Sequence, residues 1–342
     1  MSLKAAIAAR DLAQLPSRRD EDWRWTDIRG LIRVLPEASQ GHAGAVGEGP
    51  FDALADRHVR VVNGLGGEAI AVAAGETTTV ALRFVSIAAG AHTASVTVDV
   101  APGGRLTLLE SYEGDEGGYV VQAGLSITLG EGAEVERIVL ARDGALGVSV
   151  SEADVVLSPQ ASFRQTVVTD GARRQRLETR VAHPGGGALA RLDGIYLLDG
   201  QQHADLTTVL DHRGPDGRTD QLTKGVVRNQ ARAVFQGRIV VHQGADQTDA
   251  RMGHHALILS DQAEVDAKPE LQIWADDVSC SHGNTIGALD DEALFYARQR
   301  GMPFETARAL LIEAFVGEVA DRISHDGARE VVRAFAASRL EA

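Results

Sequence analysis

The chain has 342 residues, a formal net charge of −14 and a pI near 5.2. This acidity argues against nucleic-acid phosphates or an anionic membrane surface as the main partner. The single cysteine excludes a disulfide within the chain, and it excludes an all-cysteine zinc or iron–sulfur site built from one chain. No stretch approaches the roughly 20 apolar residues of a membrane span, so we expect a cytoplasmic protein without a membrane partner.

Residues 1–54 are predicted to form an N-terminal helical segment. The sequence MSLKAAIAARDLAQL has the pattern of a short amphipathic helix, and it lacks the uninterrupted apolar core and small-residue cleavage site of a secretory signal. The stretch DEDWRWTD then places Trp23 and Trp25, two of only three tryptophans, close together. We expect these large side chains to dock the segment onto the rest of the protein.

Residues 55–287 contain many short runs rich in Val, Ile, Leu and Thr, separated by Gly, Pro and Asp turns. Similar turns recur, since Ala133 and Ala161 are 28 residues apart and Gly187 follows Ala161 by 26. Such a period indicates a solenoid. A β-sandwich also has short strands, but one of this length would be large, and its turns need not recur at near-constant spacing. The aromatic content of 4% suits a narrow interior, so we predict a mainly β fold, a parallel β-helix.

Residues 288–342 are predicted to form a C-terminal helical domain. Asp290 and Asp291 at the start and Gly301 at the end predict one helix, and Pro303 marks the start of a second. A third helix is expected from a break near Gly327 to about residue 340. Helices this short cannot form a core alone, so their apolar faces must pack on the β region or on another protein. In the second helix the expected apolar face, at i, i+4 spacing, consists of Leu311, Phe315, Val319 and Ile323.

Cys280 and His282 lie at the end of an apolar, strand-like run, KPELQIWADDVSCSHGNTIG, at residues 268–287. In an extended backbone residues i and i+2 point to the same face, so this thiolate and imidazole can converge on one metal ion or sulfur species. Two ligands are half of a metal site. The alternative for Cys280 is a buried small hydrophobe.

Other candidate sites are weaker. His254 and His255 are adjacent in an expected strand, so they point to opposite faces and cannot chelate together. The three glycines at 185–187 lack the GK[ST] ending and the following helix of a phosphate-binding loop, and they are interpreted as a turn. No Walker motif occurs, so any use of ATP must come from a partner.

The run 224–323 resembles the core of the SufB/SufD family, the scaffold subunits of the SUF iron–sulfur cluster assembly machinery. Members of this family are right-handed parallel β-helices flanked by helical segments. SufB-like chains are longer and carry a clustered cysteine motif, so the lone cysteine favours the SufD branch. Weaker resemblance extends over the central strands and DEDWRWTD. The matching stretches are KGVVRNQARAVFQGRIVVHQGADQTDARM, LILSDQAEVDAKPELQIWADDVSCSHGNTIGALDDEALFYARQRG and AFVGEVADRI.

This resemblance implies a non-catalytic scaffold subunit that forms a heterodimer with SufB and docks the SufC ATPase, through which alone ATP would enter. His282, assisted by Cys280, would face SufB and share iron or a nascent cluster with a SufB cysteine. The isolated chain would hold no cofactor stably. Some of the large apolar residues of the C-terminal helices also fit a plain core role. The candidate SufC-docking residues are Leu294, Phe295, Arg298, Glu305 and Phe315.

Two other functions remain open at this point. One is a homodimeric metal-binding protein in which two Cys280/His282 pairs meet across a two-fold axis, and an exposed sheet edge at a solenoid end invites such pairing. The other is a carbohydrate-active enzyme on a β-helix, which would line a groove with carboxylates and aromatic platforms. Three Trp, four Tyr and eight Phe offer little material for that groove.

Overall fold

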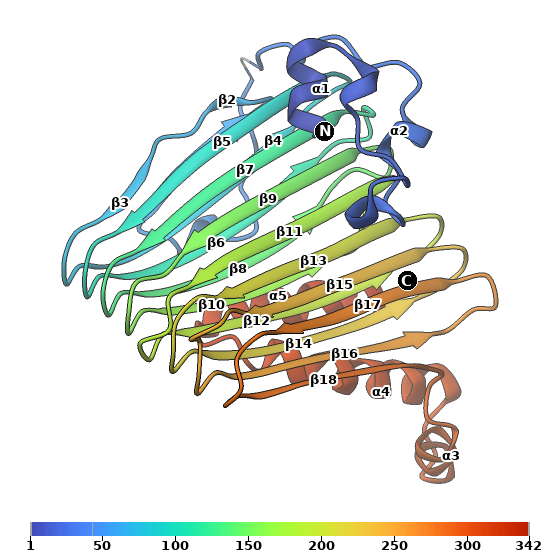
Figure 1. The fold of residues 1–342 in the computed structure, drawn as a ribbon. Coiled ribbons are helices and arrows are strands. Elements are labelled where there is room, and N and C mark those ends of the chain that lie inside the picture. The colour runs from blue at the N-terminus through green and yellow to red at the C-terminus, as the bar shows by residue number, and fades with distance from the viewer. Residues whose placement is uncertain (1, 43, 341–342) are drawn as a thin grey trace.

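A computed structural model describes residues 2–42 and 44–340, and it shows a parallel β-solenoid with helical segments at both ends (Figure 1). The chain alternates between two sheets, and every strand pairing is parallel except the antiparallel β1–β2 pair. The predicted mainly β solenoid is therefore confirmed. One sheet has ten strands: β1 (Arg57–Val62), β2 (Leu65–Gly66), β4 (Thr77–Ser86), β6 (Arg105–Gly114), β8 (Glu134–Arg142), β10 (Ser162–Thr169), β12 (Leu189–Leu198), β14 (Arg218–Val227), β16 (Asp249–Ile258) and β18 (Ser279–Gly287). The other has eight: β3 (Ile70–Val72), β5 (Ala91–Val100), β7 (Val120–Leu129), β9 (Val148–Val156), β11 (Arg174–His183), β13 (His203–His212), β15 (Arg232–Val241) and β17 (Glu264–Ile273).

Small residues at the corners let successive coils stack closely. Ala133 and Ala161 are both buried, and they immediately precede the equivalent strands β8 and β10 of neighbouring coils. The Ser162 amide donates to the Ala133 carbonyl at 2.8 Å, and the Leu189 amide donates to the Ala161 carbonyl at 2.9 Å. The turn period visible in the sequence is thus the period of these stacked corners.

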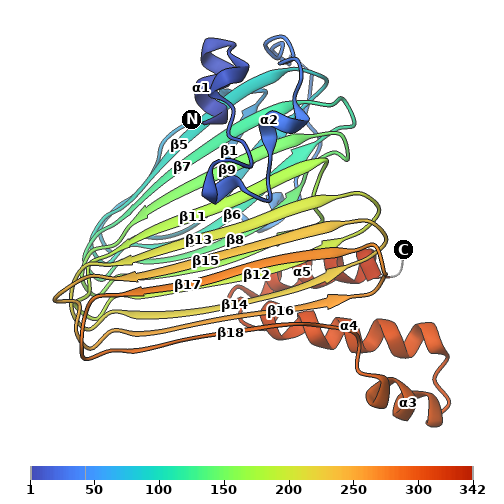
Figure 2. The ribbon, with the colours of Figure 1, turned by 45° about the vertical axis from the view of Figure 1, so that its right-hand side comes forward.

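Helical segments cover part of the outer face of each sheet (Figures 1 and 2). The N-terminal residues pack on the eight-stranded sheet, and α4 and α5 pack on the ten-stranded sheet. No helix among the described residues has the length and apolarity needed to cross a membrane. The helices are α1 (Leu3–Ala9), α2 (Ile28–Leu31), α3 (Asp291–Gln299), α4 (Phe304–Ala320) and α5 (Asp326–Leu340), with 3-10 turns at Leu12–Gln14, Glu21–Trp23 and Asp52–Leu54.

The starts of the C-terminal helices agree with the predicted signals, and the predicted apolar face of the second helix agrees in part. Asp290 caps α3, because its Oδ1 accepts hydrogen bonds from the amides of residues 292 and 293. In α4 the fully buried apolar residues include Ile312 and Val316, whereas Leu311 and Phe315 are only half-buried. Val319 and Ile323 of the predicted face are buried, and Ile323 lies just past the end of α4. Buried positions outside the predicted face arise because α4 packs against the sheet, α3 and α5 at once, so apolar residues occur on several of its sides. Gly327 lies in the first turn of α5 rather than in a break before it.

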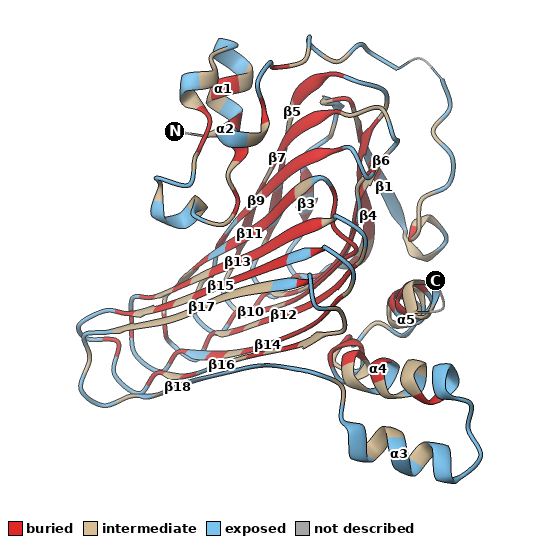
Figure 3. Cartoon of the chain, turned by 90° about the vertical axis from the view of Figure 1, so that its right-hand side faces the viewer, coloured by how far each residue is buried: buried red, intermediate tan, exposed pale blue. Residues whose placement is uncertain are grey.

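The two sheets end on strands with a free edge. β17 pairs only with β15, and β18 pairs only with β16, so within residues 2–42 and 44–340 nothing continues either sheet. Figure 3 shows the interior strands as buried and β18 as largely exposed. We call this surface, formed by β17 and β18, the open end.

Candidate functional site

The open end exposes the inward face of the last coil. Strand register places Cys280, His282 and Asn284 of β18 directly beside the inward-facing Ala250, Met252 and His254 of β16. Those three β16 residues are buried, while their β18 counterparts range from half-buried to exposed because no further coil covers them. Side chains that would be core in any earlier coil are therefore available to another molecule.

Cys280 and His282 share a face, as the spacing predicts. Cys280 is half-buried and packs against the solenoid core, and His282 is exposed. Burial raises the pKa of the Cys280 thiol, and the nearby Asp249 carboxylate adds to the rise, so a metal ion must displace a proton to bind this sulfur. Cys280 thus remains compatible with both a metal ligand and a small hydrophobic packing residue, because it contacts the core and is also partly exposed at the open end.

These two residues make an incomplete site. Among the described residues no group of three or more His, Cys, Asp or Glu side chains is arranged to hold a metal ion. A thiolate and an imidazole suit iron, zinc and other soft or borderline metals. A stable metal site at the open end would need ligands from a second molecule. The free edges of β17 and β18 offer such a molecule a surface to pair with.

Two exposed apolar side chains also lie at the open end. Ile286, also on the inward face of β18, is 41% exposed, and Trp274, just after β17, is 58% exposed beside the His242 ring. An edge strand with exposed apolar residues is a template for pairing with another chain.

The predicted docking residues of the C-terminal helices divide into two groups. Phe295, Arg298 and Glu305 are exposed, Leu294 is half-buried, and the Arg298 guanidinium lies 5.8 Å from the centre of the Phe304 ring. Phe315 instead packs into the cluster between α4 and the ten-stranded sheet, with the Lys224 ammonium 4.6 Å from its ring centre.

Residues that the sequence argument did not select enlarge the exposed group. Phe295 is 65% exposed and its neighbour Tyr296 is 60% exposed, and α3 extends away from the solenoid (Figure 2). In the sequence these residues are only apolar residues on a short helix, a pattern that is equally typical of residues buried in a hydrophobic core. We define the C-terminal apolar patch by its exposed members: Phe295, Tyr296, Met302, Phe304 and Leu310.

An N-terminal strap, residues 20–27, is fastened across the outer face of the eight-stranded sheet. The Arg176 guanidinium stacks on the Trp23 ring at 4.4 Å and donates to the Asp22 carbonyl at 2.6 Å. The Thr26 hydroxyl donates to the Asp205 carboxylate at 2.5 Å. The prediction that the tryptophan-bearing segment docks on the rest of the chain is confirmed.

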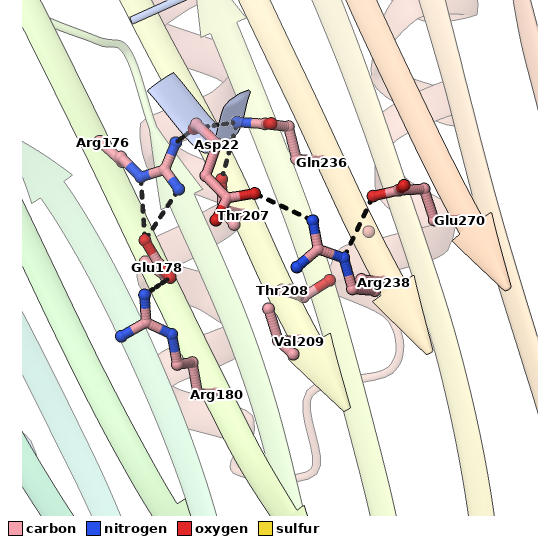
Figure 4. Close-up of a pocket in the computed structure, with 11 residues that line it drawn as sticks. Asp22, Arg176, Glu178, Arg180, Thr207, Thr208, Val209, Gln236, Arg238 and Glu270 are labelled. Carbon is pink, nitrogen blue, oxygen red and sulfur yellow. Dashed lines mark hydrogen bonds and ion pairs between the residues drawn. The ribbon is translucent and has the colours of Figure 1, made fainter. Parts of the chain in front are cut away.

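A cavity of about 110 Å³ lies beside this strap (Figure 4). Its charged lining residues pair with one another: Arg176 with Glu178, and Arg238 with both Asp22 and Glu270. Arg180 also pairs with Glu178. The cavity therefore serves to hold the strap rather than to present unpaired charge to a ligand.

His254 and His255 point to opposite faces, as predicted. His254 is fully buried, stacks on Phe235 at 4.4 Å and shares hydrogen bonds with Tyr196 and Asn284. His255 faces outward and shares a hydrogen bond with Thr285 at 2.7 Å. The sequence excluded joint chelation by the two histidines but could not connect His254 with the open end, because that connection depends on coil-to-coil register.

The solenoid and its open end lie in a region that matches a known protein family. The family model described as "SUF system FeS cluster assembly, SufBD core domain" matches residues 84–315. The chain belongs to the SufB/SufD family. Its matched region includes most of the solenoid, the open end, α3 and most of α4.

Members of the SufB/SufD family with curated names show moderate identity to the chain. The iron–sulfur cluster assembly SufBD family protein slr0076 of Synechocystis is 36% identical over 197 residues, 58% of this chain and 44% of the relative. The iron–sulfur cluster assembly protein SufD of Escherichia coli is 32% identical over 245 residues, 71% and 58% of the two chains. Protein ABCI7, chloroplastic, of Arabidopsis thaliana is 32% identical over 243 residues, 70% and 51% of the two chains. The chain thus spans about half the length of these curated relatives.

Proposed function

We propose that the chain is a SufD-type, non-catalytic scaffold subunit that works in the cytoplasm. In this role it pairs with a SufB-type partner through the open end and binds a SufC-type ATPase through the C-terminal apolar patch. The observation that carries the proposal is the pair of free edges on β17 and β18, which brings an inward-facing Cys280 and His282 to the surface of a SufB/SufD-family solenoid.

Iron or a nascent iron–sulfur cluster is the cargo in this proposal, and the isolated chain holds no cofactor stably. The exposed His282 imidazole contributes one ligand, and the partner contributes a thiolate across the interface. Cys280, after losing its proton, contributes to binding the cargo at the open end. Because each chain supplies too few ligands alone, cargo is held only while the two are paired, and it can leave when the interface opens.

The C-terminal apolar patch supports a separate partner. Exposed aromatic residues on a helix that projects from the solenoid are typical of protein-binding surfaces. The chain has no Walker motif, so ATP enters only through that second partner. Family membership favours this assembly role over a carbohydrate-active enzyme.

Co-expression with the SufB and SufC homologues of the same organism tests the proposal. Ile286→Asp places a charge on the open end and is expected to remove SufB while SufC is retained. Phe295→Asp is expected to remove SufC while SufB is retained. Val156→Asp is a matched control, because Val156 is 51% exposed on the middle of the solenoid, and it should keep both partners.

The results separate the alternatives. Failure of the wild-type chain to bind either homologue would overturn the SufD-type role. A metal-loaded homodimer that Ile286→Asp disrupts would instead support the homodimeric metal-binding protein. Loss of both partners in every variant, the control included, would contradict the assignment of two separate surfaces.

A further inference from the structure

A chain of buried polar contacts runs from the solenoid interior to the open end. His254 of β16 is fully buried, and the Phe235 ring stacks on it with an interplanar angle of 6°. One imidazole nitrogen, Nε2, lies 2.8 Å from the Tyr196 hydroxyl, and the other, Nδ1, lies 2.6 Å from Asn284 Oδ1. These hydrogen bonds, formed by a fixed and buried imidazole, hold the Asn284 side chain in one orientation.

The directions of these hydrogen bonds follow from the Asn284 oxygen. Asn284 Oδ1 can only accept, so His254 carries its proton on Nδ1 and donates it to Asn284. His254 Nε2 then accepts from the Tyr196 hydroxyl. The Asn284 oxygen is thereby occupied, and its Nδ2 amide group remains as a donor on an exposed residue.

Asn284 occupies the same inward-facing row of β18 as His282 and Cys280. Successive residues of such a row are roughly 6.5 Å apart, so an amide at 284 reaches an atom bound to the imidazole at 282. Hydrogen bonds to the sulfur atoms of an iron–sulfur cluster tune its potential and its stability.

We propose that Asn284 is a third functional residue of the open end, whose Nδ2 group donates a hydrogen bond to sulfide or thiolate sulfur held at His282. His254 and Tyr196 are positioning residues that fix the Asn284 amide. This inference rests on the proposed function, and it adds to it a sulfur-recognition residue and the buried residues that support it.

The neighbouring position supplies a matched control. Thr285, one residue further on, shares a hydrogen bond with His255 of β16 at 2.7 Å, but on the outward face. Thr285→Ala and Asn284→Ala therefore each remove one side-chain hydrogen bond between β18 and a β16 histidine. Only Asn284→Ala removes a hydrogen-bond donor from the inward face of β18, where His282 lies.

The experiment uses the complex co-expressed with the SufB and SufC homologues and reconstituted anaerobically with ferrous iron and inorganic sulfide. Complex composition is measured by gel filtration, and the rate of iron loss to a ferrous chelator is then recorded. Asn284→Ala is expected to assemble normally and lose iron about five-fold faster, the factor given by one hydrogen bond of ordinary net strength. Asn284→Asp keeps the acceptor for His254 but replaces the donor with a charge, so it should lose iron faster still. Thr285→Ala should match wild type.

His254→Phe tests positioning, because it keeps a stacked ring and removes both hydrogen bonds. It should accelerate iron loss in the wild-type background but add little to Asn284→Ala, since the two residues act as a unit. Wild-type kinetics in Asn284→Asp would overturn the proposal, as would equal acceleration in Thr285→Ala and Asn284→Ala, because either result shows a purely bracing role. A wild-type complex that forms without retaining iron would refute the proposed function itself, a different and distinguishable failure.

Discussion

Replacing Arg176 with methionine is predicted to release the N-terminal strap. The Arg176 side chain is fully buried and joins the strap to the sheet through the Trp23 ring and the Asp22 carbonyl. A desolvated cation–π contact is worth about 2 kcal/mol, and a hydrogen bond from a charged donor about 1.5 to 3 kcal/mol. Loss of both favours the open strap by roughly 3.5 to 5 kcal/mol, or a factor of about 400 to 5,000 in the opening equilibrium.

Limited trypsin digestion measures this opening. The exposed Arg18, Arg19 and Arg24 lie in or beside the strap, and cleavage there tracks the open population when closing is fast. The substitution also leaves Glu178 and Asp205 without their buried partner, which weakens the sheet itself.

Arg238→Met is the matched control for Arg176→Met. Arg238 lines the same cavity and pairs with Asp22 at 2.9 Å, but its side chain is 27% exposed. A partly exposed pair of this kind contributes at most about 1 kcal/mol, so cleavage should accelerate less than about five-fold. Unchanged cleavage in Arg176→Met, or equal acceleration in the two variants, would refute the reasoning.

Three further predictions concern the solenoid interior and the open end. Gly225→Ala would place its Cβ 1.8 Å from the Tyr196 ring, so we expect destabilisation of about 1 to 3 kcal/mol in urea unfolding, and wild-type stability would contradict this packing. Because its thiol pKa is raised, Cys280 should react with iodoacetamide more slowly at pH 7.5 than free cysteine, and pairing with SufB should slow it further; a faster reaction would contradict the half-buried site. Burial strongly lowers the pKa of five deeply buried histidines, so their protonation opposes folding. Stability should be full above about pH 6.5 and should fall toward pH 4, by roughly 2 kcal/mol per histidine at pH 5, and equal urea midpoints at pH 8 and pH 5 would contradict this. These histidines, with pKa values of about 3 to 4, are His92, His183, His203, His212 and His254.

The solenoid could be predicted because its local signals repeat. Ala133 and Ala161 recur at corners where two coils stack, and both are buried there, so the stacking of coils appears as a period in the sequence. The shared face of Cys280 and His282 could also be predicted, because it follows from the two-residue period of a strand.

Contacts between distant parts of the sequence could not be predicted in the same way. Arg176 meets Asp205 and the strap only because β11 and β13 stack in one register and the strap crosses them. His254 meets Asn284 for the same reason, since β16 and β18 are 30 residues apart in the chain. The predicted face of α4 is fully buried at Val319 but only half-buried at Phe315, because a helix packed on several sides has no single apolar face.

His282 is the residue that we propose connects the open end to cluster assembly. The most direct measurement is the iron and sulfide content of the complex purified with SufB and SufC homologues, compared between wild type and His282→Ala. His255→Ala serves as the control, because His255 lies on the neighbouring strand and faces outward. We expect that all three complexes have the same subunit composition and that only His282→Ala loses iron and sulfide. A His282→Ala complex with full iron and sulfide would contradict it.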